Sequence, residues 1–220
     1  MTTAIILSVI LTSMITFWLA DHLVHKISNT YHQRMVDLFN RVPVQPGDIV
    51  MLGDSLTDLS LWNELLPGVP VRNRGINNDN TLGVLERLDQ VIQGRPRAVF
   101  LLIGTNDLPW FTFTPDWEIL KSYEEILKRF RAEVPETVVF VQSLLPRQPR
   151  YAPRVRNINP KLKMLAERYG YPYVNLHPRF ATQRGAMRRD LSNDNLHLNG
   201  RGYAIWVEEI EPLIRGLLQE

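Results

Sequence analysis

The chain has 220 residues, of which 45% are hydrophobic and 22% charged, and its formal net charge is +2. This length suits one compact α/β domain with an appendage, and the composition excludes a largely disordered chain. The small net charge gives no reason to expect nucleic acid as a partner, and the absence of cysteine excludes disulfides, thiolate metal sites and a cysteine nucleophile.

The first twenty residues, from Met1 to Ala20, carry no charge. A helix needs about 20 mostly apolar residues to cross about 30 Å of hydrocarbon, and aromatic rings such as those of Phe17 and Trp18 favour the bilayer interface. We expect an uncleaved single-pass membrane anchor over residues 1–20. A cleavable signal peptide fits less well, because no Lys or Arg precedes the run and a small-x-small cleavage site is lacking. A buried helix of the globular domain is the third alternative.

The flanks of this run bear on its orientation. Lys26, Arg34 and Arg41 follow it, whereas no Lys or Arg precedes it. The positive-inside rule then places the C-terminal domain in the cytoplasm, with an extracytoplasmic location as the alternative.

Residues 21–42 predict a helical linker, because large apolar side chains recur there at a spacing of four. These side chains are Leu23, Ile27, Tyr31, Met35 and Phe39. Prolines at 43 and 46 then interrupt the pattern, and we expect the folded domain to occupy residues 43–220.

From residue 48 onwards, short apolar runs alternate with amphipathic patterns. The apolar runs predict strands at 48–52, 69–73, 98–103, 137–144 and 171–176. The amphipathic patterns predict helices near 80–93, 115–133, 155–169 and 200–218. Apolar strands separated by such helices indicate a three-layer α/β/α fold, in which helices cover both faces of a five-stranded parallel sheet.

Polar turns follow three of the predicted strands, and in a parallel sheet such turns meet at one edge. Gly53-Asp54-Ser55 follows the first strand, Gly75 follows the second and Asn106 follows the third. An Asp-x-x-His pair, Asp194 and His197, lies near the C-terminus. These residues are therefore expected to share one site.

This set is what acyl transfer requires. A serine hydroxyl such as that of Ser55 is a weak nucleophile until a base takes its proton, and the imidazole of His197 can be that base near neutral pH. Asp194 can orient the imidazole and stabilise its protonated form. The backbone N–H groups of Ser55 and Gly75 and the side-chain amide of Asn106 are candidate donors to an oxyanion. No metal or cofactor is needed.

The sequence resembles the SGNH (GDSL) hydrolase family in four ordered blocks. They are GDSL at 53–56, Gly75, GTND at 104–107 and DNLH at 194–197. The resemblance covers about residues 48–215 and implies a flavodoxin-like hydrolase fold. It also implies that Ser55, Asp194 and His197 form a catalytic triad, with Ser55, Gly75 and Asn106 as oxyanion donors.

Three further segments are similar to the branch that contains the platelet-activating-factor acetylhydrolase catalytic subunits. They are NRGI at 73–76, SLLPR at 143–147 and LHLNGRGYAIW at 196–206. That branch removes short acyl groups, and the resemblance implies an acyl pocket lined by Leu56, Thr105 and Leu196. The loop at 77–81 departs from the branch, because it reads NNDNT in place of a Gly-Gly-Asp-Thr run.

A basic stretch, RQPRYAPRVR, occupies residues 147–156. We interpret it as a solvated loop; the alternative is a rim that attracts an anionic lipid headgroup or an acidic sugar.

The sequence thus predicts a membrane-tethered, metal-independent serine esterase that acts on short acyl esters of a lipid or a glycan. Three alternatives stay open: a lysophospholipase or thioesterase for longer acyl chains, a sugar O-acetyltransferase, and a non-catalytic binding domain.

Overall fold

The computed structural model describes residues 28–109 and 114–219, together with Ser8, Thr12, Ser13, Thr16 and Thr112. The centre of the molecule is a five-stranded sheet with the strand order β2-β1-β3-β4-β5, and all its pairs are parallel. The strands are β1 (Ile49–Gly53), β2 (Val71–Gly75), β3 (Ala98–Leu102), β4 (Val138–Gln142) and β5 (Tyr173–Val174).

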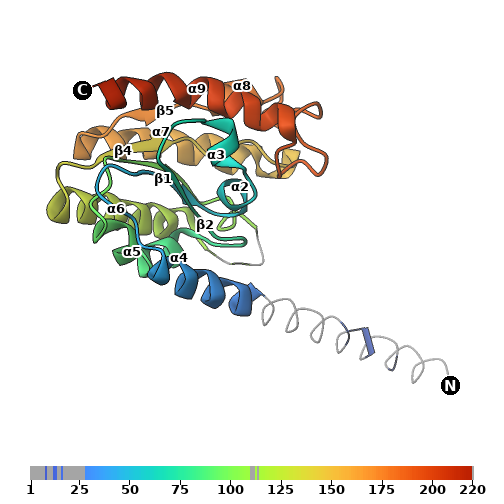
Figure 1. The fold of residues 1–220 in the computed structure, drawn as a ribbon. Coiled ribbons are helices and arrows are strands. Elements are labelled where there is room, and N and C mark those ends of the chain that lie inside the picture. Colours follow the sequence, from blue (N-terminus) through green and yellow to red (C-terminus); the bar gives the residue numbers. More distant parts are fainter. Residues whose placement is uncertain are drawn as a thin grey trace.

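Helices connect these strands and cover the sheet on both faces (Figure 1). The longer ones are α4 (Thr81–Glu86), α6 (Asp116–Glu133), α7 (Ala152–Tyr169) and α9 (Gly200–Gln219). The short ones are α2 (Ser55–Asp58), α3 (Trp62–Leu65), α5 (Asp89–Ile92), the 3₁₀ turn η2 (Pro149–Tyr151) and α8 (His177–Phe180).

Two hydrophobic cores lie on opposite faces of the sheet, because successive side chains of a strand point to opposite sides. In β1, Val50 and Leu52 pack in the core formed with α4, α5, α6 and α7. Ile49 and Met51 pack in the other core, with α3, α8 and α9. Every residue of β1 is buried, as expected for a parallel strand covered on both sides. The predicted three-layer arrangement is therefore confirmed.

Most predicted elements are present with shifted ends. The helix predicted near 80–93 is two helices, α4 and α5, since the chain turns at Arg87, whose buried guanidinium binds Asp79 at 2.7 Å. The last strand is much shorter than the predicted 171–176, and α7 begins three residues earlier than predicted, next to Pro153, which suits the first turn of a helix.

Residues 28–41 are helical and run beside α5 at the β2 side of the sheet (Figure 1). The Gln90 side chain of α5 donates to the backbone oxygen of Val36 at 2.8 Å and to Asn40 Oδ1 at 2.7 Å. The guanidinium of Arg74 stacks over the Phe39 ring at 4.5 Å. Residues 28–41 thus pack directly on the sheet domain, while a domain start at residue 43 stays a prediction.

The predicted membrane location is contradicted. Within the ranges that the structure describes, no helix is both long enough and apolar enough to cross a bilayer. The anchor predicted over residues 1–20 lies outside the described residues, except for Ser8, Thr12, Ser13 and Thr16. Membrane attachment through this segment and a cytoplasmic side for the domain are therefore not supported.

Candidate active site

Ser55 lies at the carboxyl end of β1, where the chain turns into α2. The turn requires glycine at position 53, because a Cβ there would lie 2.3 Å from the backbone oxygen of Leu102. Asp54 caps α2: its Oδ1 accepts the backbone N–H of Leu56 at 3.0 Å. Ser55 is only 2% exposed, so the turn holds its hydroxyl in a fixed and mostly dry environment.

The structure brings the three predicted triad residues together. Ser55 Oγ is 3.1 Å from His197 Nε2, although 142 positions separate them in the chain. On the other side of the imidazole, His197 Nδ1 is 2.6 Å from Asp194 Oδ2. This places a hydroxyl, a base and a carboxylate in one hydrogen-bonded line, which is the arrangement that activates a serine.

The Asp194 carboxylate is held by the turn that carries it. Its Oδ1 accepts the backbone N–H groups of Leu196 at 2.9 Å and His197 at 2.8 Å, and Asn195 closes the turn in a left-handed conformation with φ 64°. Partial burial raises the pKa of Asp194, but the hydrogen bonds from the His197 ring and from these two N–H groups outweigh it and lower the pKa to about 2. The carboxylate is therefore ionised throughout the neutral range.

Ser192 is a further residue of this turn, and it lies outside the four sequence motifs. Its hydroxyl donates to Asp194 Oδ1 at 3.1 Å and accepts the N–H of Leu196 at 3.1 Å. Ser192 also pairs with Leu198 in an isolated antiparallel bridge that closes the loop around His197. Its position two residues before Asp194 is the only sequence signal that points to it.

Asn106 follows β3 in a turn opened by Gly104, whose φ is 120°. One N–H of the Asn106 amide donates to the backbone oxygen of Asp79 at 2.8 Å, which orients the side chain and leaves its second N–H for another acceptor. Asp107 fixes this turn to α4 by accepting the N–H of Thr81 at 3.1 Å and its hydroxyl at 2.9 Å.

Gly75 ends β2, directly beside α2. A Cβ here would lie 2.2 Å from the backbone nitrogen of Asp58, so the close approach of α2 requires glycine. The N–H of Gly75 donates to Asn73 Oδ1 at 2.8 Å and therefore already has an acceptor within the protein. The role of this N–H as an oxyanion donor stays a prediction.

The helix at 28–41 reaches the loop between β2 and α4. The Tyr31 hydroxyl donates to Asp58 Oδ2 at 2.7 Å, and the same oxygen accepts the N–H of Asn77 at 3.0 Å. His32 Nε2 lies 3.6 Å from Asp79 Oδ1. The backbone oxygen of Asp79 is the one that orients Asn106, so the helix contacts the support of a candidate oxyanion donor.

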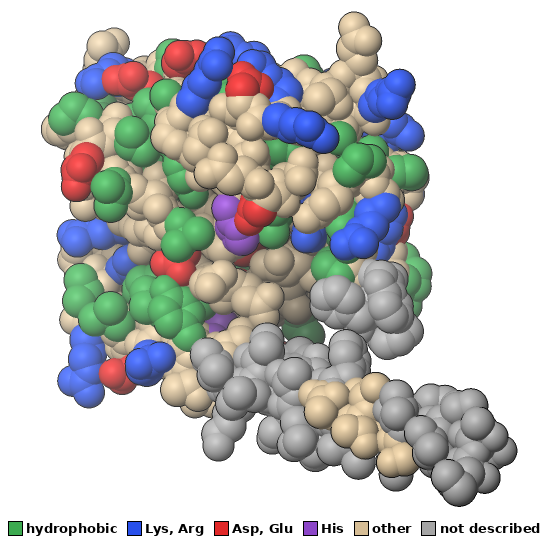
Figure 2. Space-filling model, turned by 90° about the vertical axis from the view of Figure 1, so that its right-hand side faces the viewer, with side chains coloured by type: hydrophobic (Ala, Val, Ile, Leu, Met, Phe, Trp, Pro, Cys, Tyr) green, Lys and Arg blue, Asp and Glu red, His purple; other side chains and the backbone are tan. Residues whose placement is uncertain are grey.

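Figure 2 shows the face at this edge of the sheet, with a histidine beside an acidic side chain near its centre. The side chain of His197 is 37% exposed and that of Asp194 is 52% exposed. The base can therefore be reached from solvent, while the serine lies beneath it.

Residues 51–205 match the GDSL-like lipase/acylhydrolase family. The chain belongs to this family. Over 183 residues it is 30% identical to the platelet-activating factor acetylhydrolase IB subunit alpha2 of Rattus norvegicus, which covers 79% of this chain and 78% of that protein. The alpha1 subunit of Mus musculus is 28% identical over 200 residues, covering 86% and 83% of the two chains.

Solved structures share the fold. A Streptococcus pneumonia protein described as a platelet activating factor superimposes with a TM-score of 0.81 at 24% identity, covering 89% of this chain and 98% of that one. A GDSL-like lipase from Bacteroides thetaiotaomicron does so with a TM-score of 0.72 at 21% identity, covering 84% and 97%. The predicted family and the predicted ester-hydrolysing activity are confirmed: this acylhydrolase is an enzyme that acts on ester bonds.

The residues expected to line the acyl pocket of the acylhydrolase differ in exposure. Leu56 is 1% exposed and packs in the core with α9, and Thr105 is 2% exposed. Leu196 is half-buried beside His197. The structure thus leaves only Leu196 of the three accessible to a substrate, and the assignment of all three to a pocket stays a prediction.

The basic stretch at 147–156 is not a uniform solvated loop. Arg147 is buried, donates to the backbone oxygen of Thr105 and stacks on Tyr151. Arg154 binds the Asp116 carboxylate at 2.6 Å and also donates to backbone oxygens. These two arginines of the acylhydrolase hold the loop after β4 in place, and their guanidinium groups donate to acceptors within the protein.

Proposed function

We propose that the acylhydrolase cleaves short acyl esters, acetyl esters above all, through an acyl-enzyme on Ser55. The observation that carries the proposal is the continuous hydrogen-bonded line from Ser55 Oγ through His197 to Asp194, with distances of 3.1 and 2.6 Å. A structural serine needs neither a base at hydrogen-bond distance nor a carboxylate behind that base.

In the acylation step, His197 Nε2 takes the Ser55 proton while Oγ attacks the acyl carbon. The carbonyl electron pair moves to oxygen and forms a tetrahedral oxyanion. The C–O bond to the alcohol then breaks, and His197 returns the proton to the leaving oxygen. Water repeats the sequence on the acyl-enzyme, which releases the carboxylic acid and restores Ser55. The ionised Asp194 stabilises the imidazolium in both halves.

The free N–H of the Asn106 amide and the backbone N–H of Ser55 are the donors that we assign to the oxyanion. A third donor was predicted at Gly75, whose N–H is donated to Asn73. Gly75 remains the residue that we propose as the source of the third donor.

The preference for short acyl groups is supported by the burial around the nucleophile. Leu56 and Thr105 flank the site and are almost fully buried, so a long chain entering there would have to displace core side chains. Overpacking a filled core typically costs about 1–3 kcal/mol. An acetyl group adds only one methyl and avoids most of this cost.

Hydrolysis of a p-nitrophenyl ester ladder from acetate to laurate tests the proposal. We expect the full chain to have its largest kcat/KM at acetate or butyrate, and Ser55→Ala to lose turnover at every length. Ser60→Ala is the matched control, because Ser60 is a buried serine just after α2 whose hydroxyl has no hydrogen-bond partner in residues 28–109 and 114–219.

Two results would change the assignment. A maximum at long chains would retain the triad and indicate a lysophospholipase or thioesterase. Full activity of Ser55→Ala, or failure of the wild-type serine to react with a fluorophosphonate, would refute the acyl-enzyme. Transfer of acetyl to an added sugar in preference to water would identify an acetyltransferase.

A further inference from the structure

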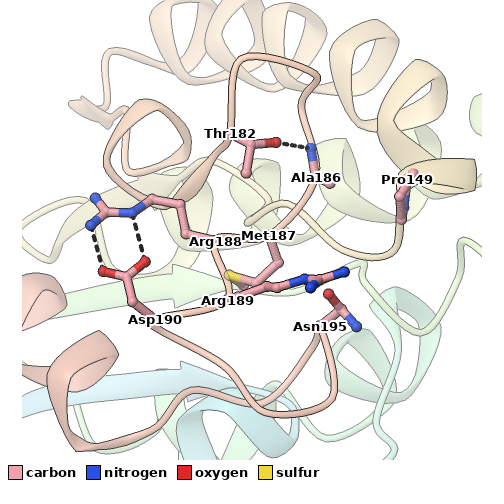
Figure 3. Close-up of a pocket in the computed structure, with 8 residues that line it drawn as sticks. All are labelled: Pro149, Thr182, Ala186, Met187, Arg188, Arg189, Asp190 and Asn195. Atoms are coloured by element: carbon pink, nitrogen blue, oxygen red, sulfur yellow. Dashed lines mark hydrogen bonds and ion pairs between the residues drawn. The ribbon is translucent and has the colours of Figure 1, made fainter.

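A cavity of about 630 Å³ lies beside the turn that carries Asp194 and His197. Its walls come from η2, from the segment after α8 and from the turn before α9 (Figure 3). The lining residues are Pro149, Thr182, Ala186, Met187, Arg188, Arg189, Asp190 and Asn195. A volume in this range suits a small organic ligand rather than a single ion or water.

The charged side chains on the cavity wall differ in whether another residue pairs with them. Asp190 is neutralised within the wall, because Arg188 binds its carboxylate at 2.7 and 3.1 Å and Arg201 lies 3.2 Å from it. Arg189 has no hydrogen-bond or ion-pair partner among the described residues. The cavity therefore offers one uncommitted positive charge and no uncommitted negative one.

The Asn195 side chain is a second polar group of the cavity wall, and it too has no hydrogen-bond partner among the residues that the structure describes. Arg189 and Asn195 both line the cavity, and in Figure 3 the Arg189 side chain points toward Asn195. The left-handed backbone of Asn195, with φ 64°, fixes its position between the two triad members Asp194 and His197. A guanidinium fork and an amide N–H₂ together match the oxygens of a carboxylate or a phosphate.

The chemistry at His197 decides which half of the substrate faces this cavity. His197 Nε2 must protonate the leaving oxygen, so the alcohol half of the ester lies on the His197 side of Ser55. Asn195 is two residues from His197 and is part of the cavity wall. The acyl half lies on the opposite side, at the buried end of the site.

We propose that this cavity binds an oxyanion, carboxylate or phosphate, carried by the alcohol half of the ester, and that Arg189 is the residue that determines this specificity. The inference rests on the proposed function, since it assumes that His197 protonates the leaving alcohol. The natural substrate is then an acyl ester of an acidic alcohol, such as an acidic sugar or a phosphorylated polyol.

The test uses acetyl esters of three phenols of similar size, which carry a carboxylate, a phosphate or a neutral amide. Each variant is compared with the wild type on the same ester, so the intrinsic reactivity of the ester cancels. For Arg189→Gln we expect kcat/KM on the two anionic esters to fall about tenfold relative to the neutral ester, mostly through KM. Arg189→Lys should retain part of the preference.

Arg184→Gln is the matched control, because Arg184 is an exposed arginine of the same segment that does not line the cavity. We expect it to keep the wild-type ratio of anionic to neutral turnover. Added salt should reduce the preference of the wild type and leave that of Arg189→Gln unchanged. A larger effect on one anionic ester than on the other would identify phosphate or carboxylate as the group that is bound.

The inference and the proposed function fail in different ways. If Ser55→Ala retains turnover of all three esters, the proposed function is wrong. If turnover depends on Ser55 but Arg189→Gln keeps the wild-type ratio of anionic to neutral turnover, the function stands and the anion site is wrong.

Discussion

Asp54 lies one residue before Ser55 and is fully buried, with Oδ1 accepting the backbone N–H of Leu56 at 3.0 Å. Its second oxygen, Oδ2, has no hydrogen-bond partner within the described part of the chain. Burial raises the pKa of Asp54 to about 7; the Leu56 N–H opposes the rise, and the nearby carboxylates of Asp79 and Asp107 add to it. The residue that caps the nucleophile helix therefore changes its protonation near neutral pH.

This shift predicts a pH dependence of stability. Because the folded pKa lies above the unfolded value of about 4, the folded protein binds the proton more tightly. Stability from this group is fully present below pH 4 and is lost as pH rises towards 7, by on the order of 4 kcal/mol at most. Asp54→Asn should flatten that decline. Urea unfolding at pH 5 and pH 8 measures it, and a parallel decline in both proteins would contradict the prediction.

Ser192→Ala removes one donor to the Asp194 carboxylate and leaves two backbone donors in place. We expect kcat to fall about two- to tenfold. The lost hydrogen bond joins a neutral hydroxyl to the carboxylate, and its loss affects only the orientation of the base. Asp194→Asn should lower kcat by about 10³ to 10⁴, since it removes the charge that stabilises the imidazolium. Steady-state kinetics on one ester compares the two variants. Equal losses would show that Ser192 is as necessary as the carboxylate.

Asn106→Ala should lower kcat about 10²- to 10³-fold with little change in KM, because an oxyanion donor acts mainly in the transition state. Fluorophosphonate labelling of Ser55 should continue at a reduced rate, which separates this loss from unfolding. Asn157→Ala serves as control: its amide binds Asp116 at 2.6 Å on the exposed surface. A KM effect without a kcat effect would place Asn106 in ground-state binding instead.

Tyr31→Phe tests whether the helix at 28–41 supports the site. It removes the hydroxyl that donates to Asp58 Oδ2, an oxygen that also holds Asn77. We expect kcat to fall about threefold. A hydrogen bond of this kind is worth about 1 kcal/mol, and the Tyr31 hydroxyl acts on the site only indirectly, through Asp58. Asn40→Ala removes a contact of the same helix to Gln90, far along the helix from the loop. The stability of Asn40→Ala should fall about as much as that of Tyr31→Phe, while its kcat stays at the wild-type value. Equal kcat values in the two variants would show that the helix has no role in catalysis.

The sequence predicted the sheet well, because each buried strand is a continuous apolar run such as AVFLL at 98–102. It predicted β5 poorly, because the strand comprises Tyr173 and Val174 alone in place of the predicted 171–176. The helix predicted near 80–93 is divided at Arg87, whose side chain turns inward to bind Asp79 and the backbone oxygen of Gly53. A local pattern carries no information about such a contact.

In the candidate site, too, the sequence predicted some features and not others. The motifs predicted which residues meet, and Ser55, His197 and Asp194 do meet. They did not predict that the N–H of Gly75 has an internal acceptor, because that depends on the orientation of the Asn73 amide, whose Nδ2 donates to the backbone oxygens of Thr57 and Asp58. Nor did they single out Arg189, whose importance comes from the pairing of its neighbour Arg188 with Asp190.

The distance along the chain between Ser55 and His197 has a consequence for biosynthesis. The nucleophile leaves the ribosome 142 residues before its base, and domains begin to fold as the chain emerges. Until α9 docks, with Trp206 Nε1 bonded to Gln142 Oε1 at 2.7 Å, the turn at 194–197 has no fixed place over Ser55. The nascent acylhydrolase therefore carries Ser55 without its base through most of its synthesis. The triad is complete only after α9 has formed and docked.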